Sequence, residues 1–170
     1  MEEVQEPSAL TMLQAHFGET VQSTLVFRGE TTAVIERSQI VDVCRFLRDE
    51  PSLHFDMLHD LTALDWLPTE REPRFQVVYH LYSVLYNHRL RLKIDVDEDD
   101  CHAPTVVPVW PTADWLEREV YDLFGITFDG HPDLRRIMMP DDWPTHPLRK
   151  DVPLGEEVVE FSHNQLPAEP

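Results

Sequence analysis

The chain has 170 residues, the length of one domain with an appended segment. Hydrophobic residues make up 42% of the sequence, enough for a folded core, and the formal net charge at pH 7 is −18. A field this negative repels phosphate groups, so we expect no nucleic-acid partner and no independent attachment to anionic lipid.

No signal in the sequence directs the chain across or into a membrane. Its acidic start, MEEVQEP, lacks the basic region of a signal peptide, and no apolar run approaches the roughly 18 residues of a membrane-spanning helix. The two cysteines, Cys44 and Cys101, form no CxxC pair, which iron–sulfur and four-cysteine zinc sites need. We therefore expect a soluble, cytoplasmic chain that binds no cofactor through thiols.

The first part of the chain predicts two helices and a β-hairpin. A short helix is expected over residues 8–17, capped by Ser8. Residues 20–36 form two β runs that turn at Arg28-Gly29-Glu30. A second helix is predicted between Ser38 and Pro51. Four residues on its apolar face follow the i, i+3, i+4, i+7 spacing and are expected in the core: Ile40, Val43, Cys44 and Leu47.

The middle of the chain predicts three strands. The first lies within 53–61, and the second, FQVVYHLYSVLY over 75–86, is apolar on both faces, which is typical of an interior strand covered on both sides. Residues 90–96 alternate apolar and polar, as a half-buried strand does. The acidic run 97–100 lacks the glycine and distal glutamate of a calcium loop and is expected to be solvated. A thiolate is disfavoured at Cys101, beside these carboxylates.

A third helix is predicted to begin at Pro111-Thr112 and to end at Gly125. The chain beyond it is punctuated by prolines and has almost no hydrophobic period. We therefore predict the α+β class, with two or three helices on a mostly antiparallel sheet forming a compact domain over residues 1–128. A long extended C-terminal tail follows over residues 129–170.

A helical wheel of the third helix gathers Leu116, Val120, Leu123 and Phe124 on one side, and places Glu117, Arg118, Tyr121 and Asp122 away from it. Glu119 falls at the edge of the apolar arc. A carboxylate there would be partly desolvated, which is costly unless it is paired. Two interpretations stay open: an ion pair of Glu119 with Arg135 or Arg136, or a proton-handling acid.

The histidines near this helix raise the question of a metal or catalytic site. His131 and His146 each precede a proline, which favours extended backbone. Glu117, Glu119 and Asp122 are near in sequence, but no HExxH motif fixes two metal ligands on one helix. We therefore expect no metal. A rival hypothesis is a stand-alone hydrolase in which Glu119 works with His131 or His146.

The tail is too short of periodic apolar residues to form a core of its own. Left free it would expose six large apolar residues: Leu134, Ile137, Met138, Met139, Trp143 and Leu148. Large apolar exposure usually marks an interaction surface, and Trp, Met and Arg are enriched at interface cores. Prolines lower the entropy lost on docking. The tail is therefore predicted to bind another protein, to wrap its own domain, or to do one with each half.

The stretch EREVYDLFGITFDGHPDLRRIMMPDDWPTHPLRKD resembles the signature of the C subunit of NADH-quinone oxidoreductase, a small hydrophilic protein in the peripheral arm of respiratory complex I. VPLGEEVVEFSHN resembles the C-terminal continuation of that family. The resemblance covers residues 105–164 and is weaker over LTALDW and FQVVYHLYSV. Thr145 and Val152 depart from the family's usual glycine and aromatic residue, which affects a local turn and one packing contact.

The resemblance implies a chain without catalytic residues that binds no flavin, cluster or quinone. FMN and iron–sulfur clusters would lie in partner subunits of a complex that passes electrons from NADH to quinone and translocates protons. This chain would dock on the quinone-site and terminal-cluster subunits, peripheral on the cytoplasmic side of the cell membrane and attached only through the complex. A rival of the same class is the equivalent subunit of a ferredoxin-driven NADH dehydrogenase-like complex or a membrane-bound hydrogenase.

The matching motif also implies which residues make structural and interface contacts. Four lie on the third helix: Glu117, Arg118, Glu119 and Asp122. Eleven lie in the tail: His131, Pro132, Leu134, Arg135, Arg136, Trp143, Pro147, Leu148, Arg149, Lys150 and Asp151.

Overall fold

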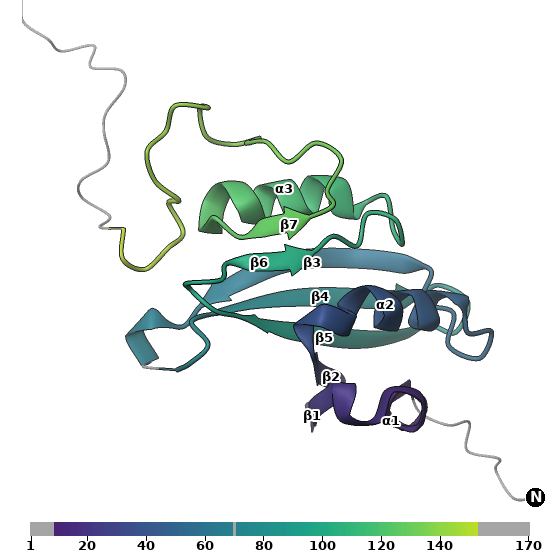
Figure 1. Ribbon diagram of the computed structural model, residues 1–170. Helices are drawn as coiled ribbons and strands as arrows, with labels where there is room; N and C mark the ends of the chain where they lie inside the picture. Colours follow the sequence, from purple (N-terminus) through teal and green to yellow (C-terminus); the bar gives the residue numbers. More distant parts are fainter. Residues whose placement is uncertain (1–8, 70, 153–170) are drawn as a thin grey trace, which may run out of the picture.

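The computed structural model describes residues 9–69 and 71–152. Its centre is a five-stranded sheet with the strand order β1-β2-β5-β4-β3 (Figure 1). The strands are β1 (Val21–Phe27), β2 (Glu30–Ile35), β3 (Met57–Asp65), β4 (Phe75–Ser83) and β5 (His88–Val96). Every neighbouring pair is antiparallel except β2 and β5, which run parallel. The predicted α+β class and mostly antiparallel sheet are confirmed.

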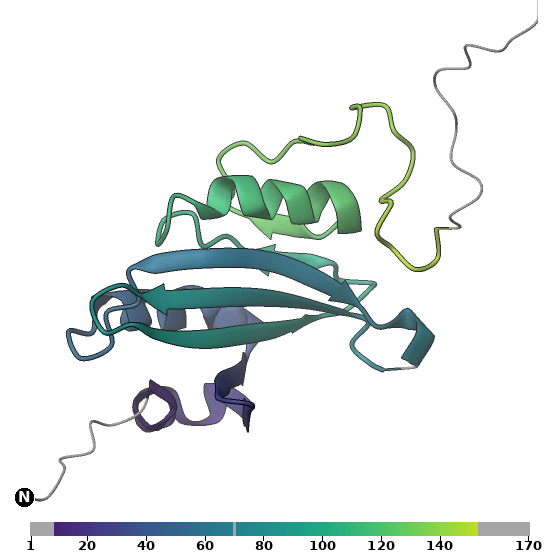
Figure 2. The same cartoon turned by 180° about the vertical axis from the view of Figure 1, so that it is seen from behind.

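The described residues form three helices, within the predicted two or three: α1 (Ala9–Phe17), α2 (Ile40–Asp49) and α3 (Ala113–Phe124). Three 3-10 turns connect elements: η1 (Gly18–Thr20), η2 (Arg37–Gln39) and η3 (Leu67–Thr69). Helix α2 lies across one face of the sheet, and α3 lies along β3 (Figures 1 and 2). The proposed helix cap Ser8 lies outside the described residues.

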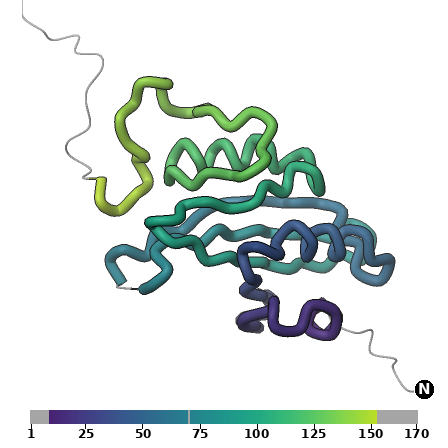
Figure 3. The backbone as a smooth tube through the Cα atoms, in the orientation of Figure 1, coloured from purple at the N-terminus to yellow at the C-terminus, as the bar shows by residue number. Residues whose placement is uncertain are grey.

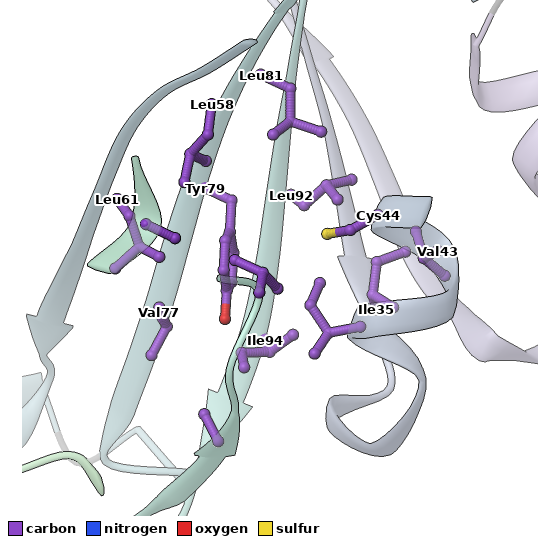
Figure 4. Packing of buried hydrophobic residues seen from close by; sticks show 14 of the residues in the cluster. Ile35, Val43, Cys44, Leu58, Leu61, Val77, Tyr79, Leu81, Leu92 and Ile94 are labelled. Carbon is purple, nitrogen blue, oxygen red and sulfur yellow. The ribbon is translucent and has the colours of Figure 1, made fainter. Parts of the chain in front are cut away.

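The core fills the space between the sheet and α2. The apolar residues of β5 alternate as predicted, and Leu92 and Ile94 have no exposed surface. They pack with Tyr79 of β4 and Cys44 of α2 (Figure 4). Strand β4 also buries Val78 on its opposite face, which agrees with its apolar character on both sides. The core position predicted for Cys44 is confirmed.

Two short strands were not predicted. β6 (His102–Pro104) and β7 (Thr127–Asp129) pair in parallel as a separate small sheet beside α3. Three residues are too few to show an alternating pattern, and the two strands are brought together only because α3 returns the chain to β6.

The described part of the tail beyond β7, residues 130–152, contains no helix or strand, and we call it the strap. It leaves β7, runs over α3 and returns toward the sheet (Figures 1 and 3). The backbone N–H of Leu148 donates to the carbonyl of Leu123 at 3.0 Å, and that of Lys150 donates to Asp65 Oδ2 at 2.8 Å. The strap therefore packs against its own domain. Residues 153–170 lie outside the described part.

Candidate functional site

Helix α3 is buried on two sides, which makes it the centre of the candidate site. It begins after Thr112 and stops before Gly125, as predicted, and Gly125 adopts a left-handed conformation. One buried stripe joins the core, and its members follow helical spacing: Ala113, Glu117, Val120 and Phe124. A second pair, Arg118 and Asp122, is covered by the strap.

The prediction that Glu119 is partly desolvated was wrong. Its side chain is exposed, whereas Glu117 and Asp122, assigned to the polar side of the wheel, have no exposed surface. Arg136 pairs with Asp122, and Arg135 pairs with Asp133. The helical wheel failed because the centre of the buried face of α3 lies one residue away from the stripe that contains Leu116 and Leu123. The polar face is covered by a second layer of chain that the wheel does not represent.

Asp122 accepts hydrogen bonds from three consecutive backbone amides of the strap. Its Oδ2 lies 3.0 Å from the N atom of Ile137, 2.7 Å from that of Met138 and 2.9 Å from that of Met139. Burial alone would raise the pKa of this carboxyl, but the three amides and Arg136 outweigh it and hold the pKa below its ordinary value. Asp122 is therefore a charged anchor that fixes the turn of the strap.

Arg136 completes this anchor by joining two parts of the strap to the helix. Its Nη1 donates to Asp122 Oδ1 at 2.8 Å, and its Nη2 donates to the carbonyl of Trp143 at 3.1 Å. His146 Nδ1 lies 2.9 Å from the backbone carbonyl of Asp122. Burial lowers the pKa of His146, so the neutral imidazole donates this bond. Trp143 Nε1 donates within the strap, to Thr145 Oγ1 at 3.1 Å.

The C-terminal end of α3 is capped by another strap residue. Arg149 Nε donates to the carbonyl of Phe124 at 2.6 Å, and its guanidinium carbon lies 5.1 Å from the centre of the Phe75 ring. A cation at this end of a helix is favourable because the last carbonyls carry partial negative charge. A Cβ at Gly125 would lie 2.7 Å from His146 and 2.9 Å from Arg149. The site therefore needs glycine for its backbone conformation and for space.

The end of the strap is bound to the sheet through Arg74, which sequence analysis did not identify. Arg74 is 8% exposed; its Nη2 lies 2.8 Å from Asp65 and 2.8 Å from Asp151, and its Nη1 also reaches Glu98. Burial would raise the pKa of Asp65, but Arg74 and the amide of Lys150 lower it to about 2. Lys150 thus contributes its backbone, while Asp151 contributes its charge.

The beginning of the strap contacts the first turns of α3. The side chain of His131 has no exposed surface; its Nδ1 accepts from the amide of Asp133, so Nε2 donates to the carbonyl of Asp114 at 3.1 Å. Arg118 Nε donates to the carbonyl of Arg135 at 3.2 Å, while the Arg135 side chain is 69% exposed. Leu134 packs against the core.

Glu117 is a buried acid that forms no ion pair within residues 9–69 and 71–152. Its carboxylate accepts from Thr105 Oγ1 at 2.5 Å and from the backbone amide of Val106 at 2.7 Å. Burial raises the pKa of Glu117 to about 7, against the lowering effect of these two hydrogen bonds. Tyr79 and Cys44 lie near it. An ionised Glu117 would repel the negative charge that either side chain carries when deprotonated. Glu117 fixes the loop that leads into α3.

Several apolar side chains on the outer surface of α3 and the strap stay exposed. Trp115 is 64% exposed and stacks with Arg118, whose guanidinium carbon lies 4.9 Å from a Trp115 ring centre. Met138 is 63% exposed and Leu148 is 47% exposed. Trp143 and Pro147 are half-buried, and Pro132 is exposed. The strap therefore contacts the helix largely through polar and backbone groups and leaves Met138 and Leu148 exposed.

Neither cysteine is activated, and burial is the main reason in both cases. Burial raises the pKa of Cys44, and it also raises that of Cys101, against the lowering effect of Arg149. The direction predicted for Cys101 is confirmed, although its main cause is burial. In residues 9–69 and 71–152 no three His, Cys, Asp or Glu side chains are grouped to bind a metal ion. No described helix is long and apolar enough to cross a membrane.

Comparison with known proteins places these features in a family. The family model described as respiratory-chain NADH dehydrogenase, 30 Kd subunit, matches residues 33–158. The C subunit of NADH-quinone oxidoreductase from Roseiflexus castenholzii is 48% identical over 159 residues, which cover 94% of this chain and 90% of that protein. The protein of the same name from Geobacter sulfurreducens is 51% identical over 146 residues, covering 86% and 88%.

Solved structures of similar fold include a fragment of Nqo5 and a chain of an archaeal respiratory complex. A trypsin-resistant fragment of Nqo5 aligns with a TM-score of 0.64 and 34% identity, covering 75% of this chain and all of the fragment. A chain of the membrane-bound sulfane sulfur reductase, an archaeal respiratory membrane complex, aligns with a TM-score of 0.69. It is 23% identical, and the match covers 92% of this chain and 94% of that chain.

Proposed function

The chain belongs to the family of respiratory-chain NADH dehydrogenase 30 kDa subunits, and on that premise we propose that it is a structural subunit of complex I. Within a proton-translocating NADH:quinone oxidoreductase it would stand in the peripheral arm, on the cytoplasmic side of the membrane. Its attachment to the membrane would be through the complex alone. Its contribution to catalysis is to assemble and position the subunits that carry the chemistry.

The observation that carries this proposal is the construction of the α3–strap surface. Buried charges, Asp122 with Arg136 and Asp65 with Arg74, fix an extended segment that has no helix or strand of its own. Met138 and Trp115 are left exposed on this fixed segment and on the helix beneath it. A surface held rigid before binding loses less entropy when a partner docks, and exposed Trp and Met are typical interface residues.

We assign no cofactor to this chain, and place FMN and the iron–sulfur clusters in partner subunits. Support comes from the state of the residues that could ligate them. Cys44 is enclosed in the core, and the raised pKa of both cysteines disfavours thiolates. The partners that we propose are the quinone-site subunit and the subunit with the terminal cluster.

A mild-detergent purification of the tagged chain from its own membranes tests this proposal, with the bound subunits identified by mass. We expect flavin, cluster and membrane subunits, including the NADH-binding subunit. Recovery of the folded chain alone would contradict it. Removal of the strap would also uncover Asp122, so Met138→Ser is a cleaner variant, with Leu85→Ser in the β4–β5 turn as the control at similar exposure. Weaker recovery of partners is expected from Met138→Ser only.

The alternative is the equivalent subunit of a complex with another electron donor, such as a ferredoxin-driven NADH dehydrogenase-like complex or a membrane-bound hydrogenase. The fold shared with a chain of the sulfane sulfur reductase keeps this alternative open. The same purification discriminates, because only the NADH-dependent complex contains an NADH-binding subunit. The stand-alone hydrolase has less support, since Glu119 is exposed while both ring nitrogens of His131 are engaged by the backbone.

A further inference from the structure

Strand β1 is an edge of the main sheet, and its half next to the hairpin turn exposes large apolar side chains. Residues from Gln22 to Phe27 are all exposed, and Leu25, Val26 and Phe27 expose 61%, 64% and 61% of their surface. Natural sheet edges are commonly protected by charge, proline or a bulge. Here the sequence VQSTLVF has no charge and no proline, and the one register shift lies at the far end, between Val21 and Ser23.

The register of the hairpin shows which backbone groups of β1 face outward. Phe27 and Glu30 flank the two-residue turn Arg28-Gly29, in which both residues have positive φ. The pair next to such a turn exchanges both hydrogen bonds, and the pattern alternates along the ladder. The N–H and C=O groups of Val26 and Thr24 therefore point to the free edge. An added β-strand is the partner that satisfies a row of such groups.

The hairpin end of this edge is basic, although the whole chain is strongly acidic. A groove of about 230 Å³ begins at the hairpin turn and crosses the sheet as far as β3; its charged and titratable lining residues are Arg28, Glu30, His59, His80, Arg89 and Arg91. Arg91 pairs with Glu30. Within residues 9–69 and 71–152, neither Arg28 nor Arg89 forms a salt bridge; each lies instead over an aromatic ring. This distribution favours a partner with carboxylates at that end.

We propose that β1 accepts an extended strand from a neighbouring protein subunit. The strand covers Leu25, Val26 and Phe27 with apolar side chains and carries an acidic residue that reaches Arg28 at the hairpin turn. A second copy of this chain is the competing occupant, and the concentration dependence of amide exchange distinguishes the two.

The strap and β1 lie at opposite ends of the molecule (Figures 1 and 2). With partners at both ends, the chain bridges two neighbours. The β1 inference does not depend on which partner binds the strap.

Amide hydrogen exchange, resolved by residue, tests the proposal on the full chain alone and in the complex purified from its own membranes. We expect the Thr24 and Val26 amides to exchange at least about tenfold more slowly in the complex, as added strand pairing requires. Unchanged exchange on assembly would overturn the proposal. Protection in the isolated chain that grows with its concentration would also overturn it, because a second copy would then fill the edge.

Two variants identify the chemistry of the contact. Val26→Lys places a charge in the middle of the edge, and Val84→Lys is the matched control, since Val84 is 59% exposed in the β4–β5 turn. Arg28→Glu reverses a charge at the groove while leaving the edge intact, and serves if Val26→Lys fails to fold. If either variant, but not the control, loses the slow amide exchange of β1 in the complex, the added strand is supported. If the β1 amides exchange as slowly in both variants as in the wild type, the proposal is contradicted. Neither variant changes a residue of the strap surface.

Discussion

Asp122 and Arg136 form an ion pair of 2.8 Å across the junction between α3 and the strap, with side chains that are 0% and 13% exposed. The same carboxylate accepts three backbone amides, so one residue determines the path of the strap over the helix. A buried charge of this kind is strongly destabilising when its partner is removed.

Asp122→Asn should lower the free energy of unfolding by about 3–5 kcal/mol, because Arg136 would be left buried without a counter-charge. Urea unfolding followed by tryptophan fluorescence measures the change. The control is Asp133→Asn, which removes the exposed ion pair with Arg135 and should change stability by no more than about 1 kcal/mol. Equal effects of the two variants would show that Asp122 is not an anchor.

Gly125→Ala should destabilise the junction more than Gly29→Ala does. Both glycines have positive φ, +76° and +80°, so both variants carry a similar backbone strain of roughly 1–2 kcal/mol. Only the Cβ at position 125 would meet His146 and Arg149. We expect an additional loss of about 1–3 kcal/mol in the unfolding free energy and faster proteolysis of the strap. Similar losses in the two variants would refute the close approach.

Glu117 should make the protein less stable as the pH rises toward neutrality. Its pKa is about 7 when folded and 4.5 ordinarily, so the folded state binds more protons between these values. The stabilisation is complete below pH 4.5 and is lost as the pH rises through about 7. Glu117→Gln should remove this dependence, which amounts to up to about 3 kcal/mol. A difference in the free energy of unfolding between wild type and variant that stays constant from pH 5 to 8 would contradict this prediction.

Asp65 should have the opposite dependence. Its pKa is lowered from 3.8 to about 2, so its contribution is present above pH 3.8 and is lost as the pH falls through about 2. Asp65→Asn should weaken this acid sensitivity and cost about 1–3 kcal/mol at pH 7, because Arg74 loses its buried partner but keeps the exposed carboxylates of Asp151 and Glu98. The exposed pair of Asp42 with Arg45 supplies the control, Asp42→Asn. Acid unfolding monitored by circular dichroism measures the acid sensitivity of both variants.

Local pattern was enough to predict most of the regular structure. The alternation in β5, the apolar run in β4 and the stop at Gly125 each depend on near neighbours, and each was confirmed. The parallel pairing of β2 with β5, and the short strands β6 and β7, depend on segments far apart in sequence. No local pattern could reveal them.

The candidate site shows the same division between local and distant information. The motif from EREVYDLF to HPLRKD identified the family and drew attention to Asp122, Arg136 and Arg149, all of which join α3 to the strap. It could not show that Glu119 is exposed and Glu117 is buried, nor that Arg74 receives Asp151.

The sequence by itself determined most of the secondary structure, the family, and the α3 and strap residues that meet at Asp122. Only the tertiary structure decided which carboxylates are buried and which cations they meet. The physical reason is that the hydrophobicity of a helix orients it toward one layer only. The charged face of α3 is buried by a second layer, the strap, whose backbone amides and arginines replace water around Asp122.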